Sequence, residues 1–511
     1  MPNRAVALYE RATKTPEKIA IVFENKTWTY LELLNAALAY ASGLSKAGFG
    51  KYDKLGLMIA TRPEFIALEY ATFILGGAIA PMNVHYQGNE IEHALVSCDI
   101  NFLVIDNNCA LHLKPDFEKR CTSLRKVFVF GSTFDSGFFN DAESLNSDPA
   151  LAPEPVDVEP ESTALMLYTS ATTGKAKGVM LSLANLQSNH DASPEWLYLD
   201  SDEVILCALP LYNTFGLNQC INATIYLGAT LVLLPKFDPL SVLQSIENWK
   251  CTFFPAVPTM LQRVLDFPEV DHFNLTSLRR FCVGAAPVPG PLLIKLRQRI
   301  AQDAIVIHGY GLTESTALVT TIQVVLDENG LVRNAKSIGR ALPGIEMRIA
   351  AENGTNAQLG QVGEICIKGP CVMKGYYNAP EATSEAIVDG WLHTGDLGTM
   401  DVEGFFNIVD RKKDLIIRGG QNIYPVDIEE VLYHHPLVAE AAVIARPNEE
   451  LGEVPVAFVS LKLNEVVTVD ELLALCKSEL AYYKVPASIQ ILSELPKGPT
   501  GKILRRALRA H

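Results

Sequence analysis

One segment constrains the fold of this chain more than any other. Ala164–Tyr168 is an apolar stretch of strand length, and a run of hydroxyl-bearing and small residues with two lysines follows it directly. From position 168 to position 178 the run reads YTSATTGKAKG. Backbone N–H groups at such a strand end can surround oxyanions, and lysines add positive charge. The segment therefore predicts a strand that leads into a polyphosphate-binding loop; the structural alternative is a flexible, solvated loop.

The loop does not have the Walker pattern. That pattern requires a glycine five residues before Gly174, where this chain has Thr169, and a hydroxyl residue where it has Ala176. A second glycine pair, Gly309 and Gly311, resembles the start of a dinucleotide fingerprint, but a glutamate stands in the place of the third glycine. The sequence thus argues against a Rossmann dehydrogenase as well.

Four further polar motifs follow along the chain. They are Tyr310–Ser315, which comes after the apolar stretch Ala304–Ile307, then Trp391–Asp396, Asp410–Asp414 and Pro499–Lys502. Together with the loop they resemble the core motifs of the adenylate-forming superfamily, which includes acyl-CoA synthetases, adenylation domains of peptide synthetases and firefly luciferase. The matches keep the family's order and spacing, so the resemblance covers nearly the whole chain.

The resemblance implies a reaction of two steps that uses ATP, Mg²⁺, a carboxylic acid and coenzyme A (CoA). A carboxylate is a poor acyl donor, but its attack on the α-phosphate of ATP gives an acyl-adenylate and pyrophosphate, and a thiol can then displace AMP. Such chemistry depends on positioning and charge neutralisation more than on a protein nucleophile. The chain has no Gly-x-Ser-x-Gly elbow that would indicate another acyl-transfer route.

By resemblance, residues of several motifs bind the nucleotide. The ATP- or AMP-binding positions are Thr169, Ser170, Thr172, Thr173, Lys177, Gly284, Ala285, Ala286, Pro287, Tyr310, Gly311, Asp396 and Arg411. Tyr310 is expected to lie against the adenine, and Asp396, an acceptor-only carboxylate, to accept hydrogen bonds from the ribose. Thr313 is expected to bind the α-phosphate and Glu314 to hold Mg²⁺. The structural alternatives are a helix cap for Thr313-Glu314 and a simple turn for Asp396.

The resemblance also assigns the moving parts. Lys502 is expected to enter the site for adenylation, bridge the carboxylate and the α-phosphate, and then swing away; by itself it is an ordinary exposed lysine. Lys413 stands at the hinge position between the two domains. Gly419, Gly420 and Gln421 form the loop expected beside the pantetheine arm of CoA in the thioester-forming state.

By position in the family, the acyl pocket involves Tyr212, Asn213, Gln219, His308 and Gly309, together with Gly284. The two glycines are expected to leave room, and Tyr212 and His308 to offer flat, partly polar walls. This favours an aromatic or cyclic acid, or a short-to-medium chain, over a long fatty acid. Gln219 and His308 are equally compatible with structural roles.

Two departures from the family pattern keep other functions open. Ala171 replaces a usual glycine of the loop, where a Cβ costs roughly 1 kcal/mol if the backbone is left-handed. Asn213 replaces a common histidine. The alternatives are an enzyme that loads the pantetheine of a carrier protein, a nucleotide-binding relative with impaired catalysis, and, without specific support, a luciferase-like oxidation. The segment Gly419–Tyr424 looks more like that of CoA ligases.

The periodicity predicts an α/β protein of several domains, because 511 residues exceed one compact core. Strand-like and helix-like segments alternate from the N-terminal part to past residue 300, which predicts layered α/β subdomains with largely parallel strands. Short strands and frequent glycines from about 338 to 409 predict a small β-rich subdomain. The resemblance sets a large N-terminal adenylation domain at 1–410 and a small, mobile α+β domain at 411–511.

Several single elements have clear boundary signals. Thr29 and Glu32 form a capping-box pattern that opens a helix ending near Ser45, and Thr468 with Glu471 opens another. The sequence also predicts a helix over residues 426–433 and a strand over residues 454–463.

Composition limits the partners and the compartment. A net charge of −15 argues against nucleic acid or an anionic membrane as the main partner. No apolar run is long enough for a transmembrane span, the N-terminal segment lacks the apolar core of a signal peptide, and the ten cysteines show no CxxC pair. The expectation is a cytoplasmic enzyme whose partners are a small carboxylic acid, ATP and CoA; a homodimer is compatible with the sequence.

Overall fold

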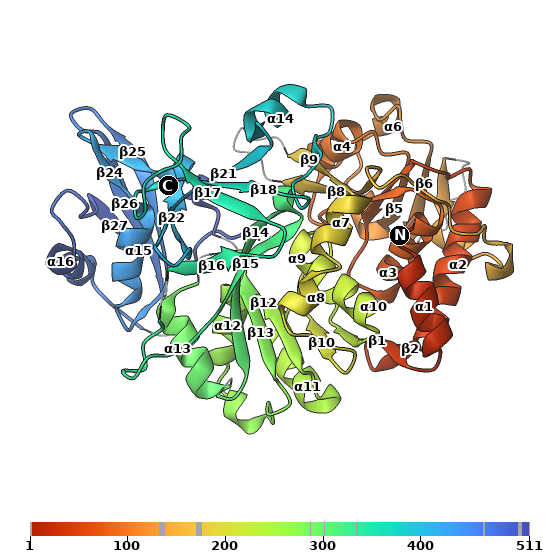
Figure 1. Cartoon of the computed structure of the whole chain (residues 1–511), viewed down its shortest axis with the longest axis horizontal. Helices are drawn as coiled ribbons and strands as arrows, with labels where there is room; N and C mark the ends of the chain where they lie inside the picture. The colour runs from red at the N-terminus through yellow and green to blue at the C-terminus, as the bar shows by residue number, and fades with distance from the viewer. Residues whose placement is uncertain are drawn as a thin grey trace.

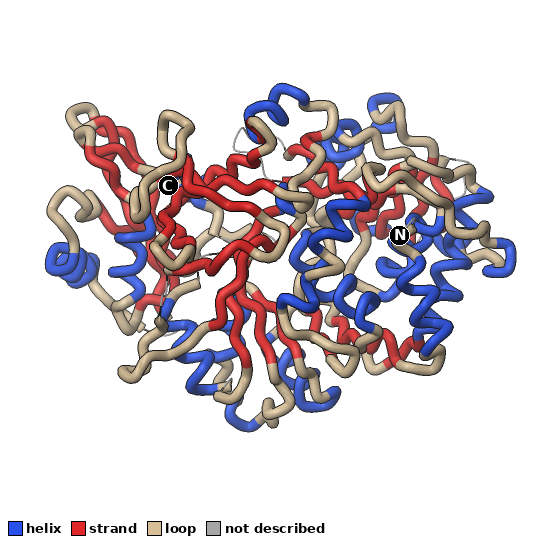
Figure 2. The backbone as a smooth tube through the Cα atoms, in the orientation of Figure 1, coloured by secondary structure: helices blue, strands red, loops and turns tan. Residues whose placement is uncertain are grey.

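The computed structural model describes residues 3–131, 138–169, 176–286, 288–300, 302–333, 336–462, 465–498 and 503–509. In Figure 1 the first part of the chain forms the right-hand side of the molecule and the last hundred residues form its left-hand end. Figure 2 shows strands through the centre and the left, and helices gathered on the right and lower sides. The layered α/β fold predicted from the sequence is confirmed.

The largest sheet contains a parallel half. In the order β1 (Ile19–Phe23), β11 (Thr230–Leu233), β10 (Val204–Cys207), β12 (Phe253–Ala256), β13 (Arg280–Gly284) and β14 (Ile305–Leu312), neighbouring strands pair in parallel, and β2 (Lys26–Thr29) closes the edge antiparallel. The connecting helices are α11 (Pro239–Trp249), α12 (Pro258–Leu265) and α13 (Gly290–Arg299). These strands are mostly buried apolar runs, as expected for parallel strands that are covered on both faces.

The second sheet is also mainly parallel. Its strands, in spatial order, are β19 (Gly375–Tyr376), β9 (Lys177–Ser182), β8 (Thr163–Thr169), β4 (Ala78–Pro81), β3 (Lys54–Met58), β5 (Phe102–Asp106), β6 (Lys126–Phe130) and β7 (Phe139–Asp141). Only the pairings of β8 with β9 and of β9 with β19 are antiparallel among these. The predicted strand before the phosphate loop is β8, which ends at Thr169, and β9 begins at Lys177; residues 170–175 of the loop lie outside the described residues.

Helices cover both sheets. They are α1 (Val6–Lys14), α2 (Tyr30–Lys46), α3 (Pro63–Ile74), α4 (Gly88–Ser97), α5 (Asn107–Ala110), α6 (Phe117–Arg120), α7 (Leu183–Asn189), α8 (Ser193–Trp196), α9 (Thr214–Gly216) and α10 (Ala223–Leu227), with the turns η1 (Ala142–Leu145), η2 (Pro149–Leu151), η4 (Val270–His272) and the π-helical η3 (Leu217–Asn222). The predicted capping box opens α2: the Glu32 N–H donates to Thr29 Oγ1 at 3.1 Å, and the Thr29 N–H donates to Glu32 Oε2 at 2.7 Å.

The predicted β-rich region is a continuation of the largest sheet. β15 (Ala317–Gln323) pairs with β14 on one side and with β16 (Ser337–Ala341) on the other, both antiparallel. The sheet then runs through β22 (Phe406–Arg411), β21 (Trp391–Met400), β18 (Gly363–Lys368) and β17 (Glu346–Ala350), with β20 (Ile387–Val388) on β21 and the helix α14 (Pro380–Ala386) nearby. The short strands are as predicted, but hydrogen bonding through β15 joins them to the parallel half, so they do not form a sheet of their own.

The C-terminal part has its own sheet and apolar core. β24 (Gln421–Ile423), β23 (Ile416–Arg418), β26 (Gly452–Leu461) and β25 (Val438–Asn448) are neighbours, and β27 (Ser488–Leu492) pairs with β26. The helices are α15 (Pro425–Tyr433), α16 (Val469–Glu479) and α17 (Arg505–Leu508). Thr468 caps α16 as predicted, accepting from the Glu471 N–H at 3.2 Å. The domain boundary predicted between residues 410 and 411 falls at the end of β22. The strand predicted over residues 454–463 is β26, which begins and ends two residues earlier.

The two N-terminal sheets share one apolar core. Leu55 and Leu57 of the second sheet belong to the same buried cluster as Phe254 and Val306 of the largest sheet. Both sheets therefore have fixed positions relative to each other, and the polar segments that follow their strands meet at one place. None of the helices in the part of the chain that the structure describes has the length and apolar character that a bilayer crossing needs.

Candidate active site

A cavity of about 1120 Å³ lies where the strands of both N-terminal sheets end. Its lining includes residues at, or directly after, the carboxyl ends of parallel strands: Ile59, Thr169, Ala208, Leu234, Val257, Gly284, Gly311 and Leu312. Ligands of open α/β sheets bind at this end of the strands. Arg411, Lys413, Glu494, Lys497 and Gly498 line it from the side of the domain junction and the C-terminal domain.

The segment after β14 brings Thr313 and Glu314 to the cavity. They form the single turn η5 (Thr313–Ser315), so the helix-cap alternative is limited to one 3₁₀ turn. The hydroxyl of Tyr376 donates to Glu314 Oε1 at 2.9 Å, and Lys177 Nζ lies 4.9 Å from the centre of the Tyr376 ring. Burial, with the Glu314 carboxylate beside it, raises the pKa of Tyr376. Tyr376 therefore stays a hydrogen-bond donor that orients Glu314.

Asp396 lies close to both Tyr310 and Arg411. The Tyr310 hydroxyl donates to Asp396 Oδ2 at 2.7 Å, and Arg411 Nε lies 2.9 Å from Oδ1. The arginine comes from β22, directly opposite Asp396 of β21 in the sheet register. Asp396 is 3% exposed, and burial with its carboxylate raises the pKa of Tyr310 well above the usual value. Three predicted nucleotide contacts are thus assembled by two neighbouring strands and the end of β14.

Glu364 is a site residue that the sequence analysis missed. Its carboxylate accepts the Gly395 N–H at 3.0 Å and lies 3.1 Å from both His393 Nδ1 and Lys412 Nζ. Burial alone raises the pKa of this carboxyl, but the contacts with His393, Lys412 and Gly395 outweigh it and lower the pKa. One carboxylate on β18 therefore holds both the turn before Asp396 and the first residue of the domain junction, η6 (Lys412–Asp414).

Four of the predicted acyl-pocket residues, Tyr212, Asn213, Gln219 and Gly309, line the cavity, as does Gly284. Asn213 has a structural role besides: its Oδ1 accepts the Gly216 N–H at 3.0 Å and caps α9. The place of His308 in the acyl pocket stays a prediction. His308 is not part of the described lining; its side chain is buried against the backbone of Ser337, and burial lowers its pKa to about 4. Side chains alternate along β14, so the face that presents Gly309 cannot also present His308.

Gly284 and Gly309 have close neighbours at the position where a Cβ would lie. A Cβ on Gly284 would lie 2.5 Å from the backbone oxygen of Gly309, and one on Gly309 would lie 2.5 Å from Leu318 Cδ1. Gly311 is tighter still, with the Ala317 oxygen 1.5 Å from such a Cβ. At Gly284 and Gly311 the neighbouring strand's backbone leaves no space for a side chain, whereas at Gly309 the neighbour is the end of the Leu318 side chain. The expectation that Gly284 leaves room for the acid stays a prediction.

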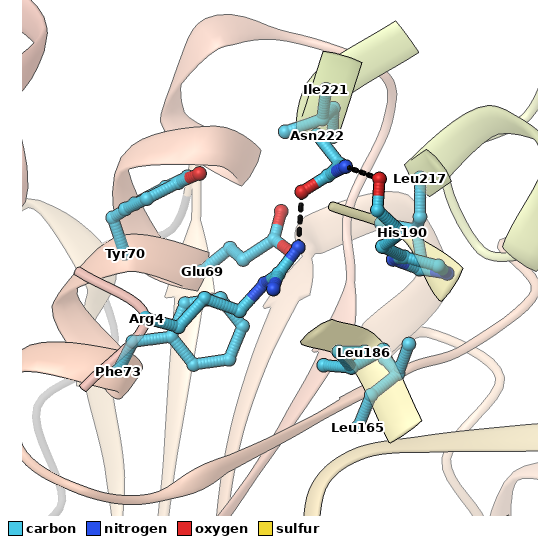
Figure 3. Close-up of a pocket in the computed structure, with 10 residues that line it drawn as sticks. All are labelled: Arg4, Glu69, Tyr70, Phe73, Leu165, Leu186, His190, Leu217, Ile221 and Asn222. Atoms are coloured by element: carbon cyan, nitrogen blue, oxygen red, sulfur yellow. Dashed lines mark hydrogen bonds between the residues drawn. The ribbon is translucent and has the colours of Figure 1, made fainter. Parts of the chain in front are cut away.

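A second, small cavity of about 10 Å³ lies behind η3 and is drawn in Figure 3. Arg4 reaches into it, pairs with Asp191 at 2.9 Å and donates to Asn222 Oδ1. Asn222 Nδ2 in turn donates to the His190 backbone oxygen at 2.6 Å. Figure 3 shows the Glu69 carboxyl beside the Arg4 guanidinium, and burial raises the pKa of Glu69 to about 8. This polar cluster ties the N-terminal segment, α3 and α7 to the element that carries Gln219.

Comparison with known proteins decides the family. The model of the AMP-binding enzyme family matches residues 8–377, and that of the AMP-binding enzyme C-terminal domain matches residues 427–502. The chain belongs to the AMP-binding enzyme family. The adenylate-forming resemblance inferred from the motifs is thereby confirmed.

This AMP-binding enzyme has relatives over its full length. A long-chain-fatty-acid–CoA ligase of Bacillus subtilis is 35% identical, over 99% of this chain and 94% of that protein. A feruloyl-CoA synthase of an Amycolatopsis species is 33% identical, over 98% of this chain and 97% of that protein. Among solved structures, o-succinylbenzoate CoA synthetase from Bacillus subtilis with its acyl-adenylate has a TM-score of 0.83 at 32% identity, over 100% of this chain and 98% of that chain.

The metal predicted for this AMP-binding enzyme fits the residues present. Among the described residues no group of three or more His, Cys, Asp or Glu side chains is arranged to hold a metal ion. Mg²⁺ does not need such a group, because it binds one or two carboxylates together with substrate phosphates and water. Glu314, in the cavity lining and oriented by Tyr376, supplies a carboxylate of this kind.

Some predicted residues of the AMP-binding enzyme cannot be placed. Ser170, Thr172, Thr173, Pro287 and Lys502 lie outside the described residues. Ala285 lines the cavity with a φ of +66°, whereas Ala286 is not in the described lining. The assignment of these residues to ATP binding and of Lys502 to catalysis stays a prediction.

The domain junction carries a dense set of charges. Arg505 of α17 pairs with Glu429 at 2.7 Å and with Asp414 at 3.3 Å. Asp410 Oδ2 accepts the Val426 N–H at 3.0 Å, and burial raises its pKa to about 6. Burial, with other cations nearby, lowers the pKa of the predicted hinge residue Lys413, which lines the cavity.

The predicted CoA loop forms a tight hairpin. Gly419 and Gly420 join β23 to β24 with φ values of +56° and +80°, a two-residue turn that favours glycine at both positions. Neither glycine nor Gln421 is in the described lining of the cavity. Their contact with pantetheine was predicted for the thioester-forming state and remains a prediction for that state.

Proposed function

We propose that this protein is an AMP-forming acyl-CoA synthetase, a ligase that joins an acid to a thiol. It activates a carboxylic acid with ATP and Mg²⁺, transfers the acyl group to CoA, and releases AMP and pyrophosphate. One observation carries the proposal: a single cavity joins a charged side, with Lys177, Glu314 and Arg411, to a mainly apolar side. The full-length similarity to CoA ligases agrees with it.

In the first step a carboxylate oxygen of the acid forms a bond to the α-phosphorus of ATP while the bond to the pyrophosphate oxygen breaks. Thr313 binds the α-phosphate, Lys177 faces the outer phosphates, and Asp396 holds the ribose. When bound at Glu314, Mg²⁺ neutralises phosphate charge. The chain's own contribution is to position the groups and to exclude water, which suits a step with little covalent chemistry for the protein.

In the second step the CoA sulfur attacks the acyl carbonyl, the bond to the AMP oxygen breaks, and the thiol proton passes to solvent. Lys502 acts only in the first step and leaves with the C-terminal domain, which turns about Lys413. We therefore expect Lys502→Ala to lose most adenylate formation while thioester formation from supplied acyl-AMP continues. An equal loss in both half-reactions would contradict this role.

The acid is aromatic or cyclic, or a chain of short-to-medium length. The apolar side of the cavity is lined by Phe65, Leu211, Tyr212, Phe215, Phe237 and Met260, which offer flat and flexible surfaces. Among the relatives, feruloyl-CoA synthase and o-succinylbenzoate CoA synthetase have names that contain an aromatic acid. A cytoplasmic location is part of the proposal, and it is supported by ten cysteines that are all free thiols.

The test is AMP release from ATP over a panel of aliphatic, cyclic and aromatic acids, with and without CoA. Turnover that depends on CoA and on one group of acids supports the ligase and identifies the acid class. Exchange of pyrophosphate into ATP without CoA-stimulated AMP release would point to a carrier-protein acceptor instead. If no acid supports either reaction, the proposed function is wrong.

A further inference from the structure

Two buried polar side chains face the apolar side of the cavity, and neither step of the reaction uses them. Thr214 lies in α9 and Gln219 in η3, and both line the cavity. Thr214 is 9% exposed and Gln219 is 1% exposed. Polar atoms buried to this degree are almost always hydrogen-bonded, because leaving them without partners destabilises the fold.

The amide of Gln219 has more hydrogen-bonding capacity than its protein neighbour uses. Nε2 donates to Ser193 Oγ at 3.2 Å, and the same hydroxyl lies 3.5 Å from Oε1. The side-chain amide has two donor hydrogens and an oxygen with two lone pairs. The Ser193 hydroxyl can bond with at most one of these hydrogens and one of these lone pairs. In the described contacts, a donor and an acceptor site of Gln219 are therefore left for a group in the cavity.

In the described contacts, the Thr214 hydroxyl also has a side-chain hydrogen-bond partner on one side only. Its Oγ1 lies 3.4 Å from His190 Nε2. His190 is buried, and burial holds its pKa well below the usual value, so the ring is neutral. A neutral imidazole nitrogen takes one hydrogen bond with the hydroxyl, and a hydroxyl can make further bonds as donor or acceptor. The polar cluster of Figure 3 lies directly behind, where Asn222 holds the His190 backbone.

The two side chains come from consecutive helical turns. Thr214 opens α9, the π-helical turn η3 with Gln219 follows α9 directly, and both residues line the cavity. Cys220, the next residue, has its pKa raised by burial and by the nearby thiols of Cys207 and Cys282. Cys282 also lines the cavity, so η3 is fixed against the end of β13.

We propose that Thr214 and Gln219 form a polar subsite for a hydrogen-bonding substituent on the acid, remote from the reacting carboxylate. The inference rests on the proposed function and narrows its substrate class. Because Thr214, Gln219 and His190 are uncharged, the subsite suits a neutral hydroxyl, keto or amide group. Lys236 and Arg263 also line the cavity, but neither is in the described hydrogen bonds of Thr214 or Gln219. The substrate is thus a ring-sized or medium-chain acid with a neutral polar group at its far end.

The experiment compares acids in matched pairs that differ only by a hydroxyl: benzoic with 4-hydroxybenzoic acid, cinnamic with 4-hydroxycinnamic acid, and octanoic with 8-hydroxyoctanoic acid. The readout is kcat/KM for CoA-dependent AMP release. A site built to bond a hydroxyl rejects the analogue without it, so the wild-type protein should prefer the hydroxy acid of at least one pair by about tenfold or more. Gln219→Leu and Thr214→Val should each remove most of that preference.

The controls separate recognition from folding. Tyr226→Phe changes an exposed residue of α10 outside the described lining and should leave the preference ratio unchanged. A purely structural role for Gln219 would lower kcat/KM equally for both acids of a pair, and that result would overturn the subsite. Ratios near one for all three pairs of acids with the wild-type protein would also overturn the subsite. This test does not depend on the folding of the variants. Absence of AMP release with every acid would instead overturn the proposed function.

Discussion

At the scale of the residue, contacts explain what the motifs could only suggest. Asp396 and Arg411 belong to different motifs, yet they face each other across β21 and β22, where Tyr310 joins them. Glu364 could not be recognised from the sequence, because an acid in an alternating strand is the ordinary pattern of a half-exposed sheet. Only the structure shows its three contacts, which are with His393 and Gly395 just before Asp396 and with Lys412 at the domain junction.

Replacement of Glu364 by glutamine should weaken ATP binding. The change removes a charge that holds the Gly395 N–H and Lys412, and hydrogen bonds to charged groups contribute about 1.5–3 kcal/mol. We expect KM for ATP to rise about tenfold or more, while KM for the acid changes little, as measured by initial rates of AMP release. Glu346→Gln, an exposed acid of the same sheet, is the control. Equal changes of both KM values would contradict a positioning role.

Gly309→Ala should narrow the acyl side of the cavity. The new Cβ would lie 2.5 Å from Leu318 Cδ1, which is the flexible end of a side chain that lines the cavity, so Leu318 has to move. We expect kcat/KM to fall for ring-sized acids about tenfold more than for acetate, since lost fit in a pocket amounts to 1–3 kcal/mol. The double variant Gly309→Ala/Leu318→Ala should recover ring-sized acids; failure of this rescue would show that the backbone, not Leu318, was displaced.

At the scale of the element, short sequence patterns were sufficient to predict where a helix or a strand exists and which of the two it is. The capping box predicted the start of α2 and Thr468 that of α16, because caps are formed by neighbours in sequence. The predicted end of α2, near Ser45, lies one residue before the observed end. The π-turn η3 and the cluster behind it could not be predicted. Arg4, Glu69 and Asn222 come from segments far apart in the chain, and no short pattern joins them.

The titration of Glu69 on α3 predicts a pH dependence of stability. Its pKa is raised by burial to about 8, above the unfolded value, so the folded state holds the proton more tightly. Between about pH 4.5 and pH 8 the unfolded chain ionises this group and the folded protein does not, so stability falls as pH rises. Relative to the wild-type protein, Glu69→Gln should gain thermal stability from pH 5 to pH 8, and the gain should level off above that. Glu64→Gln on the same helix is the control; equal shifts in both variants would refute the assignment.

At the scale of the whole molecule, the order of the motifs predicted one site but not how two sheets form it. The resemblance and the periodicity indicated layered α/β subdomains and a C-terminal domain, and both are present. The sequence could not show that the β-rich strands continue the largest sheet, because antiparallel pairing of β14, β15 and β16 is a long-range choice. Nor could it show on which face of β14 His308 lies, since a single-residue difference of register reverses the face.

The orientation of the C-terminal domain gives a last prediction. Lys497 and Gly498, the last described residues before Lys502, line the cavity in this arrangement. Lys336, before β16, bridges to α15 of the C-terminal domain through Glu430 at 2.8 Å, and its side chain is 54% exposed. An exposed ion pair contributes about 0–1 kcal/mol, so Lys336→Ala should slow adenylate formation by about two- to fivefold.

The effect of Lys336→Ala should be confined to one half-reaction. Pyrophosphate exchange measures adenylate formation, and acyl transfer from supplied acyl-AMP measures the second step, which in the proposed mechanism follows a turn of the C-terminal domain about Lys413. We expect exchange to fall and transfer to stay equal or to rise, with Lys336→Arg close to wild type because it keeps the charge. High salt should remove the difference between variant and wild type, since it screens exposed pairs. If both half-reactions slow equally, this ion pair does not hold the domain in the present arrangement, and the buried contact of Asp410 with the Val426 N–H would have to do so.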